Sequence, residues 1–479
     1  MNRSQAIGPD KPVVVVANRL PVIRGDKGWE LSPGGLVTAL RPVMASQSGA
    51  WVGWDGGTKG MPETLPDSSV RLLPIALSAA RLRDYYYGFA NTALWPLLHN
   101  MIEKPRFERS WWFAYRDVNG TFADRAAAAL DEQRMAIAWV HDYHLMLVPQ
   151  LIRDRGVTAP IGFFLHTPWA SPDIYARLPW RGQILQGLLG ADVVAFHTDE
   201  YRTNFLRSCT RVLGDSGIEV RGTSVILPDG RAVATATAPI SIDAGDFARH
   251  ATDPETTGDI QALAEQFRGR RLLLGVDRLD YTKGIVERLL AVEMVLERNP
   301  ELRTSLAFLQ IAVPSRDNVR EYRQLRGTVE QHIGRINGLF TEPGSDVPVH
   351  YFYRSLSPQQ LAGYYALADA LLVTPLIDGM NLVAKEYVIV QQARRGAGAL
   401  VLSEFTGAAV ELPQAVLCNP FDVEGLSYRI EHALGLPEAA RREALVAMAD
   451  NVRTHDVYHW VSGQLAQIAG RGVSADTAD

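Results

Sequence analysis

Short apolar runs, each followed by a helical pattern, recur along most of this 479-residue chain. Residues 13–17 are four valines and an alanine, apolar on both faces and rich in β-branching, as in a central strand of a parallel sheet. Similar runs occupy residues 138–140, 161–165, 193–196, 272–276, 306–312, 370–373 and 400–402. This alternation of strand and helix patterns predicts an α/β fold with parallel sheets.

One interruption divides the chain into two parts. Residues 220–238 contain Gly, Pro and short Val/Thr-rich pieces that predict a hairpin, and residues 254–269 predict a charged helix. Leu272 then begins a new series of strands. We therefore expect two Rossmann-like, doubly wound lobes, residues 1–245 and 246–456, with an active site in the cleft between them.

Charge and cysteine content exclude several classes of protein. The chain has 48 Lys and Arg against 53 Asp and Glu, a net charge of −5 that offers no basic field for nucleic acid. Cys209 and Cys418 form no Cys/His group with metal-ligand spacing, so neither a disulfide framework nor a zinc site is expected. The early apolar run 13–17 is far shorter than the roughly 20 residues of a membrane-spanning helix. We expect a cytoplasmic protein without nucleic-acid or membrane partners.

Polar residues follow the predicted strands directly, where the ligands of open α/β sheets bind. Arg19 follows the first strand and could be either an anion contact or a surface charge. Gly34 and Gly35 precede a helix predicted at 37–44. Backbone N–H groups there can approach a phosphate, although a plain turn explains the same pair of glycines.

Two other strand ends of the first lobe carry imidazole and carboxylate groups. His141 and His144 are three residues apart with no matching set of acidic ligands, which argues against a metal site. Helix capping explains one of the two loops but not both. Asp142 and His166 are expected at one edge of the sheet, where a carboxylate and a neutral imidazole suit the hydroxyls of a sugar.

In the second lobe, Arg278 and Lys283 flank a turn at the end of the first strand. They could clamp a diphosphate, or pair with nearby aspartates. We expect both side chains at a solvated edge. A later strand leads through Asp378 into a glycine-containing loop and a helix, where Glu386 could reach a ribose diol.

Taken together, these segments resemble the trehalose-6-phosphate synthase family of retaining glycosyltransferases. The resemblance spans roughly residues 13–465 in the family's order, and the stretch 378–387 is its most specific part. The segments that carry it are residues 17–19, 32–36, 86, 89–95, 141–145, 163–166, 277–284, 314–316 and 378–387.

The resemblance implies a GT-B fold in which the last helix, within residues 457–479, packs back on the first lobe. It implies an enzyme that transfers glucose from UDP-glucose or GDP-glucose to glucose 6-phosphate, with the base left open. The first lobe would bind the acceptor and the second the nucleotide sugar. A homo-oligomer, dimer or tetramer, is also implied.

The residues that the family assigns to each task are implied in the same way. The donor would be held by Gly34, Gly35, His166, Arg278, Lys283, Asp378, Gly379, Met380, Asn381, Leu382, Val383 and Glu386. The acceptor would be held by Arg19, Tyr86, Trp95, Asp142 and Arg316. Catalysis would depend on Asp142, His166, Arg278 and Lys283. No metal and no cofactor are expected, because the two cations stabilise the leaving diphosphate.

Two alternatives remain at this stage: a pseudo-glycosyltransferase with a different acceptor, and an inactive regulatory homologue. The first would be expected to alter the acceptor residues and the second to lose one of His166, Arg278 or Lys283, yet all are present. Ile377, Thr167 and Trp169 depart from the family's usual residues, which leaves the fine donor preference undetermined.

Overall fold

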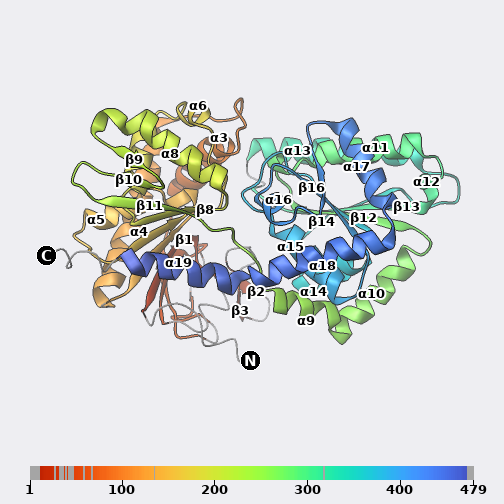
Figure 1. The fold of residues 1–479 in the computed structure, drawn as a ribbon, viewed down its shortest axis with the longest axis horizontal. Coiled ribbons are helices and arrows are strands. Elements are labelled where there is room, and N and C mark those ends of the chain that lie inside the picture. Colours follow the sequence, from red (N-terminus) through yellow and green to blue (C-terminus); the bar gives the residue numbers. More distant parts are fainter. Residues whose placement is uncertain are drawn as a thin grey trace. The chain divides into compact units, whose positions relative to one another are not determined.

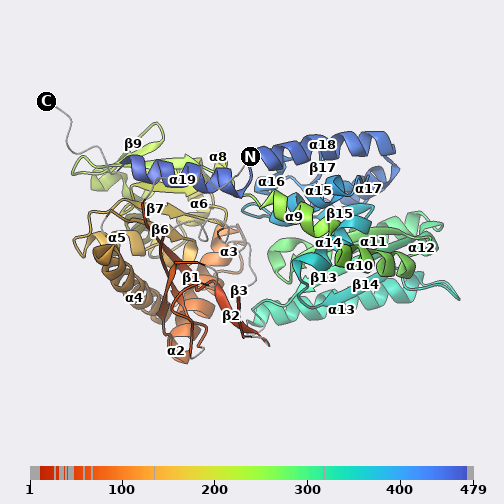
Figure 2. The same cartoon turned by 90° about the horizontal axis from the view of Figure 1, so that it is seen from below.

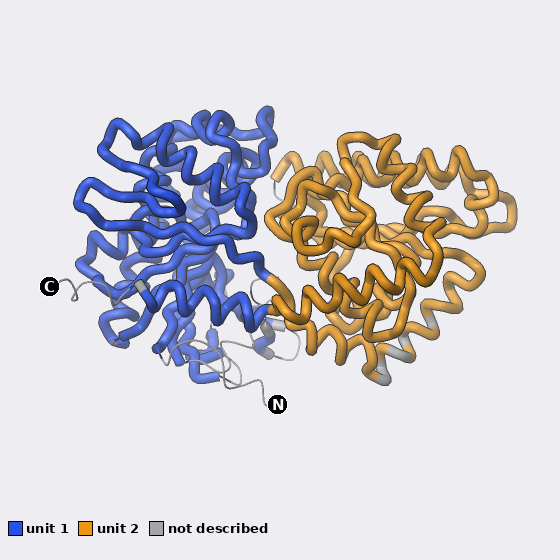
Figure 3. Tube along the Cα trace, in the orientation of Figure 1, with its two compact units in different colours: residues 1–240, 457–479 blue, residues 241–456 orange. Residues whose placement is uncertain are grey.

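The chain folds into two compact units, residues 1–240 with 457–479 and residues 241–456 (Figure 3). This computed structural model describes residues 11–25, 28–31, 37, 40, 48–57, 60–65, 68–133, 135–316 and 319–471. Each unit contains its own sheet and buried core, as expected for a chain too long for a single hydrophobic core.

Among the described residues of unit 1, nine strands form one sheet in the order β5-β4-β1-β6-β7-β8-β11-β10-β9 (Figure 1). The first seven in this order pair in parallel, and β10 pairs antiparallel with β11 and β9 at one edge. From β1 the chain winds to β4 and β5, then returns to β6 and winds the opposite way, so the winding reverses between β1 and β6. The strands are β1 Val13–Arg19, β4 Gly49–Trp54, β5 Arg71–Ile75, β6 Ile137–His141, β7 Ile161–Phe164, β8 Val193–Phe196, β9 Glu219–Arg221, β10 Ser224–Ile226 and β11 Ala232–Thr237, with a separate hairpin of β2 Val22–Gly25 and β3 Gly28–Leu31.

Helices cover both faces of this sheet, and α4 and α19 lie on opposite faces (Figure 2). The C-terminal helix α19 belongs to unit 1: Trp460 Nε1 donates to the carbonyl of Ala238, and Ile468 packs on β7 where Gly162 leaves room. The helical segments are α2 Ala79–Leu82, the π-helix η2 Arg83–Leu94, α3 Trp95–Leu98, α4 Arg109–Glu132, η3 Tyr143–Leu145, α5 Val148–Arg153, α6 Pro172–Tyr175, α7 Arg181–Leu188, α8 Asp199–Leu213, η4 Gly214–Ser216 and α19 Val457–Arg471.

Unit 2 contains a parallel sheet whose described strands are ordered β14-β13-β12-β15-β16-β17. The chain winds from β12 toward β14, crosses to β15 and winds toward β17, so the winding reverses between β12 and β15. The strands are β12 Arg271–Arg278, β13 Leu306–Val313, β14 Val349–Tyr353, β15 Ala370–Val373, β16 Ala399–Ser403 and β17 Val416–Cys418.

Right-handed crossovers place α11 and α13 on one face of this sheet and α14 and α15 on the other. The core includes Leu289, Val329 and Ile430, packed under the first of these faces. The helical segments are α9 Ala244–Thr252, α10 Pro254–Gln266, η5 Tyr281–Lys283, α11 Ile285–Arg298, α12 Leu302–Ser305, α13 Arg320–Phe340, α14 Pro358–Leu367, α15 Leu382–Ala393, α16 Gly407–Glu411, α17 Val423–Gly435 and α18 Glu438–Thr454.

The α/β fold and every strand expected from an apolar run are confirmed. The expected hairpin is the β9-β10-β11 meander, and the charged helix is α10. Six strands were not predicted: β2, β3, β4, β5, β14 and β17. Two of them have weak strand patterns, because β5 contains Pro74 and β14 mixes His350 with aromatic residues. Most of the helix predicted at 37–44 lies outside the described residues.

Candidate active site

The first group of predicted site residues lies where the winding of unit 1 reverses. Asp142 follows β6 with φ of +75°, a left-handed conformation that is costly for a residue other than glycine. Its N–H donates to the carbonyl of Phe164 (2.8 Å), and its Oδ1 accepts from the backbone N–H of His166 (3.3 Å). The structure therefore brings Asp142 and His166 together at one edge of the sheet, as the sequence predicted.

Arg19, at the end of β1, lies among aromatic rings. Its guanidinium carbon is 4.6 Å from the ring centroid of Trp54 and 5.6 Å from that of Tyr86, distances typical of cation–π contacts. Tyr86 comes from the π-helix η2 and stacks on His144. π-helical turns are rare in proteins as a whole, but those that occur are often found at functional sites. The position of Tyr86 in η2 therefore supports a binding role for this residue. Trp54 was missed by sequence reasoning, because β4 was not recognised.

Trp95, the other aromatic residue assigned to the acceptor, is buried at the start of α3. It packs on His99 and Tyr143, with ring centroids 4.0 and 5.6 Å away. Trp169 is buried too, with its Nε1 donating to Ser208, and so belongs to the core of this unit. Gly34 and Gly35 lie outside the described residues.

Three imidazoles form a row across the ends of β6, β7 and β8. His141 Nδ1 lies 3.1 Å from Nε2 of His166, and the ring of His166 packs edge-on against His197 with centroids 5.6 Å apart. Burial, reinforced by the neighbouring imidazole, lowers the pKa of both His141 and His166 well below the usual range. Both rings are therefore neutral, which suits hydrogen bonding to sugar hydroxyls.

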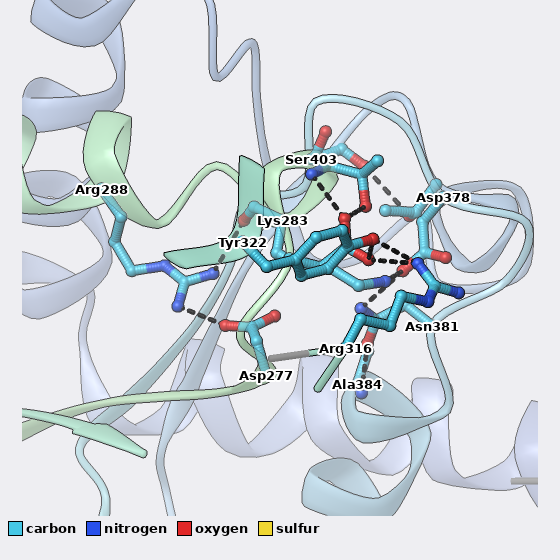
Figure 4. Close-up of polar contacts among 12 residues, drawn as sticks. Asp277, Lys283, Arg288, Arg316, Tyr322, Asp378, Asn381, Ala384 and Ser403 are labelled. Atoms are coloured by element: carbon cyan, nitrogen blue, oxygen red, sulfur yellow. Dashed lines mark hydrogen bonds and ion pairs between the residues drawn. The ribbon is translucent and has the colours of Figure 1, made fainter. Parts of the chain in front are cut away.

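The second group lies where the winding of unit 2 reverses (Figure 4). Lys283 ends the short helix η5, and its Nζ donates to Asp378 Oδ2 at 2.5 Å. Gly284 follows with φ of +61°, and a Cβ there would lie 2.1 Å from the carbonyl oxygen of Thr374. Only glycine allows this close approach between the turn after β12 and the end of β15.

Lys283 is only 7% exposed, so the expectation that it lies at a solvated edge is wrong. The aliphatic part of the Lys283 side chain is buried, and its ammonium group pairs with the carboxylate of Asp378, which follows β15. Arg278 is exposed, as expected, and its charge still acts on the buried Asp280.

The loop after β15 leads into the N-terminus of α15. Asn381 caps this helix from a left-handed conformation: its Oδ1 accepts from the backbone N–H of Ala384, and its Nδ2 donates to Asp378 (Figure 4). Gly379 and Met380 lie in the loop, and Leu382 and Val383 begin the helix. Backbone N–H groups and the dipole of a helix N-terminus favour a phosphate at this position.

Glu386 lies in the second turn of α15 and accepts a hydrogen bond from the hydroxyl of Tyr365 on α14 (2.9 Å). Burial raises the pKa of Glu386 to about 7, although the hydrogen bond from Tyr365 lowers it. Its carboxylate is held on one oxygen, which leaves the other for a ligand.

Arg316 lies in unit 2, where its guanidinium donates to Asp280 Oδ2 at 3.1 Å and to the hydroxyl of Tyr322 (Figure 4). Asp280 is fully buried; burial acts to raise its pKa, but the charges of Arg316 and Arg278 and a backbone hydrogen bond from Thr282 lower it to about 2. Asp280 is thus a charged anchor for Arg316. Arg19 belongs to unit 1, so a joint contact of both arginines with one phosphate stays a prediction.

Arg288 was not singled out from the sequence, although its hydrogen bonds link the three neighbouring strands β13, β12 and β15. It is fully buried on α11 and donates to Asp277 (2.6 Å), Gln310 (2.8 Å) and Thr374 (3.0 Å), the first drawn in Figure 4. The available signal was its position three residues after Ile285, on the apolar face of the helix.

The described part of the chain contains no cluster of three His, Cys, Asp or Glu able to hold a metal ion. It also contains no helix long and apolar enough to cross a membrane.

Comparison with known proteins places these residues in a family. The sequence profile of glycosyltransferase family 20 matches residues 11–470. This chain belongs to glycosyltransferase family 20. It is 43% identical to a trehalose-6-phosphate synthase of Mycobacterium ulcerans, over 98% of this chain and 96% of the relative. It is 42% identical to that of Mycolicibacterium smegmatis, over 99% of this chain and 95% of the relative.

Solved structures of this family have the same fold. An alpha,alpha-trehalose-phosphate synthase (UDP-forming) from Burkholderia vietnamiensis superimposes with a TM-score of 0.89 at 33% identity, covering 98% of this chain and 99% of that one. The Escherichia coli protein bound with UDP-2-fluoro glucose gives a TM-score of 0.86 at 33% identity, covering 96% and 99%. The resemblance, the GT-B fold and the glycosyltransferase activity predicted from the sequence are thus confirmed.

Proposed function

We propose that this glycosyltransferase transfers glucose from UDP-glucose to glucose 6-phosphate and forms α,α-trehalose 6-phosphate and UDP. The observation that carries the proposal is the site of unit 2, in which Lys283, Asp378 and the N-terminus of α15 converge where the winding reverses. This is the position at which doubly wound sheets bind nucleotides.

The donor fits the residues of this site. Arg278 and Lys283 supply the positive charge for a diphosphate, and the backbone N–H groups of residues 379–383 supply hydrogen-bond donors. The unoccupied oxygen of Glu386 suits a ribose hydroxyl, since a carboxylate accepts from two sides. Asp378 already holds Lys283 and would also meet the glucose, with His166 contributed by unit 1.

The acceptor fits the residues around Arg19. Its guanidinium and the hydroxyl of Tyr86 suit a phosphate dianion, while Trp95 and Asp142 suit the sugar. Arg316, anchored by Asp280, would be the second cation on the phosphate. We assign acceptor binding chiefly to unit 1 and donor binding to unit 2.

The reaction then needs positioning and charge stabilisation rather than a protein nucleophile. The bond between C1 of glucose and the diphosphate oxygen breaks, and C1 bonds to the O1 hydroxyl oxygen of glucose 6-phosphate on the same face. The hydroxyl proton passes to the departing phosphate oxygen, and UDP leaves. Arg278 and Lys283 stabilise the charge that develops on this oxygen.

Relatives support uridine as the base, since the Burkholderia enzymes are named UDP-forming and the Escherichia coli protein binds UDP-2-fluoro glucose. A Burkholderia xenovorans relative is in complex with glucose-6-phosphate. These names favour the synthase over a pseudo-glycosyltransferase or an inactive homologue. We further propose a cytoplasmic location, since hexose phosphates and nucleotide sugars are cytoplasmic metabolites, and a homo-oligomer, which the family resemblance implies.

The test is direct. Purified protein is incubated with glucose 6-phosphate and UDP-, GDP- or ADP-glucose in turn, and both nucleotide release and the disaccharide phosphate are measured. We expect the highest turnover with UDP-glucose and very little with unphosphorylated glucose as the acceptor. Absence of a disaccharide phosphate with all three donors would overturn the proposed function.

A further inference from the structure

The contact between His141 and His166 requires one of the two rings to donate a hydrogen bond to the other. His141 Nδ1 and His166 Nε2 are 3.1 Å apart, and both imidazoles are neutral. A neutral imidazole carries one N–H and one bare nitrogen. The hydrogen bond therefore links the protonation of the two rings, and the second nitrogen of His141 decides its direction.

Nε2 of His141 is buried and has no hydrogen-bond partner within the described part of the chain. If His141 accepted the hydrogen bond at Nδ1, its proton would be on Nε2 and a buried N–H would be left without an acceptor, which is rare in proteins. If His141 donates from Nδ1, its N–H is satisfied and only a lone pair is left at Nε2. The second arrangement leaves no orphaned donor.

His166 must then accept at Nε2, which places its own proton on Nδ1. His166 is partly exposed, and its only side-chain hydrogen bond within the described residues is the one at Nε2. Nδ1 is the nitrogen that remains for a ligand. We propose that His141 is a positioning residue that locks His166 in the Nδ1–H form, so that His166 presents a hydrogen-bond donor to a hydroxyl oxygen of the bound sugar.

The surroundings hold both rings in this geometry. The ring of His141 packs on Trp139, with ring centroids 4.5 Å apart. The ring of His166 packs on Phe164 and lies near Trp460 of α19, with centroid distances of 4.7 and 6.2 Å. Trp460 is itself fixed, because its Nε1 donates to a backbone carbonyl. Close packing on several sides opposes a flip of the His166 ring, which would exchange its two nitrogens.

The identity of the sugar rests on the proposed function, but the protonation of His166 does not. It is measured on the full-length, ligand-free enzyme by NMR with 15N-labelled histidine, and His166 is assigned from the signals that disappear in His166→Asn. We expect the wild type to carry the proton on Nδ1 of His166. Protonation at Nε2 would overturn the proposal.

Two variants of His141 separate positioning from packing. His141→Asn keeps an N–H near the place of Nδ1, whereas His141→Leu fills similar space without a donor. We expect His141→Leu to shift the proton of His166 toward Nε2, the form favoured in free imidazole side chains, and His141→Asn to retain it on Nδ1. Equal protonation of His166 in wild type and both variants would overturn the proposal.

Kinetics provide an independent readout. We expect His141→Leu to raise the KM for UDP-glucose about tenfold, the equivalent of about one lost hydrogen bond, with a much smaller change for glucose 6-phosphate. In His141→Asn, the KM for UDP-glucose should stay close to that of the wild type. An equal loss in both variants, or an equal rise for both substrates, would show a structural role for His141 and contradict the proposal. If the wild type transfers no glucose, the proposed function fails, and the NMR measurement still decides the role of His141.

Discussion

Substitution of Glu386 by Gln should change the pH dependence of stability in a defined direction. Burial raises the pKa of this carboxyl group from its ordinary value of 4.5 to about 7. The folded chain therefore binds this proton more tightly than the unfolded chain. The contribution of Glu386 to the free energy of unfolding is fully present below about pH 4.5 and is lost as the pH rises through about 7.

The size of the effect follows from the shift. One pKa unit corresponds to about 1.36 kcal/mol, so a rise from 4.5 to about 7 corresponds to a loss of about 3 kcal/mol between acid and alkaline pH. Glu386→Gln keeps the shape and an oxygen that accepts from Tyr365, but it does not titrate. We expect the difference in free energy of unfolding, variant minus wild type, to move by about 3 kcal/mol in favour of the variant from pH 4.5 to pH 8.

The assay is native-state hydrogen exchange of the α15 amides in increasing urea, because two units with separate cores need not unfold together. Glu443→Gln, at an exposed position on α18, measures the effect of losing one solvated carboxylate. Tyr365→Phe removes the hydrogen bond that lowers the pKa of Glu386 and should move the transition to higher pH. A difference between Glu386→Gln and wild type that does not change with pH would refute the reasoning.

Three other substitutions test the site. Lys283→Ala and Arg278→Ala should each lower kcat about a hundredfold, but only the first should lower the melting temperature, because Lys283 is buried against a carboxylate and Arg278 is exposed. Arg288→Met should lower the free energy of unfolding in a urea titration by about 3–5 kcal/mol, since Asp277 stays buried without its cation, and a second change, Asp277→Leu, should restore part of it. Arg19→Ala should raise the KM for glucose 6-phosphate far more than that for UDP-glucose; an equal rise for both would place Arg19 elsewhere.

Much of the fold was predictable because a buried parallel strand has a local signature. Residues 13–17 and 370–373 are continuous apolar runs. Such a run predicts a strand buried on both faces even when the neighbouring strands are not known. The edge strand β14 has only one fully buried residue, Val349, so its pattern is weak and it was missed. The same logic placed Asp142 and Asp378 correctly after their strands, because parallel strands bring their carboxyl ends to one edge.

The burial and the side-chain contacts of the site residues were decided by the tertiary structure. The sequence by itself determined two α/β units with polar strand ends and the family to which the chain belongs. It did not determine that Lys283 is buried, that His141 contacts His166, or that Arg288 joins three strands. Each of these facts depends on which strands are neighbours in the sheet, and that order follows from packing between residues far apart in the chain, which local patterns do not encode.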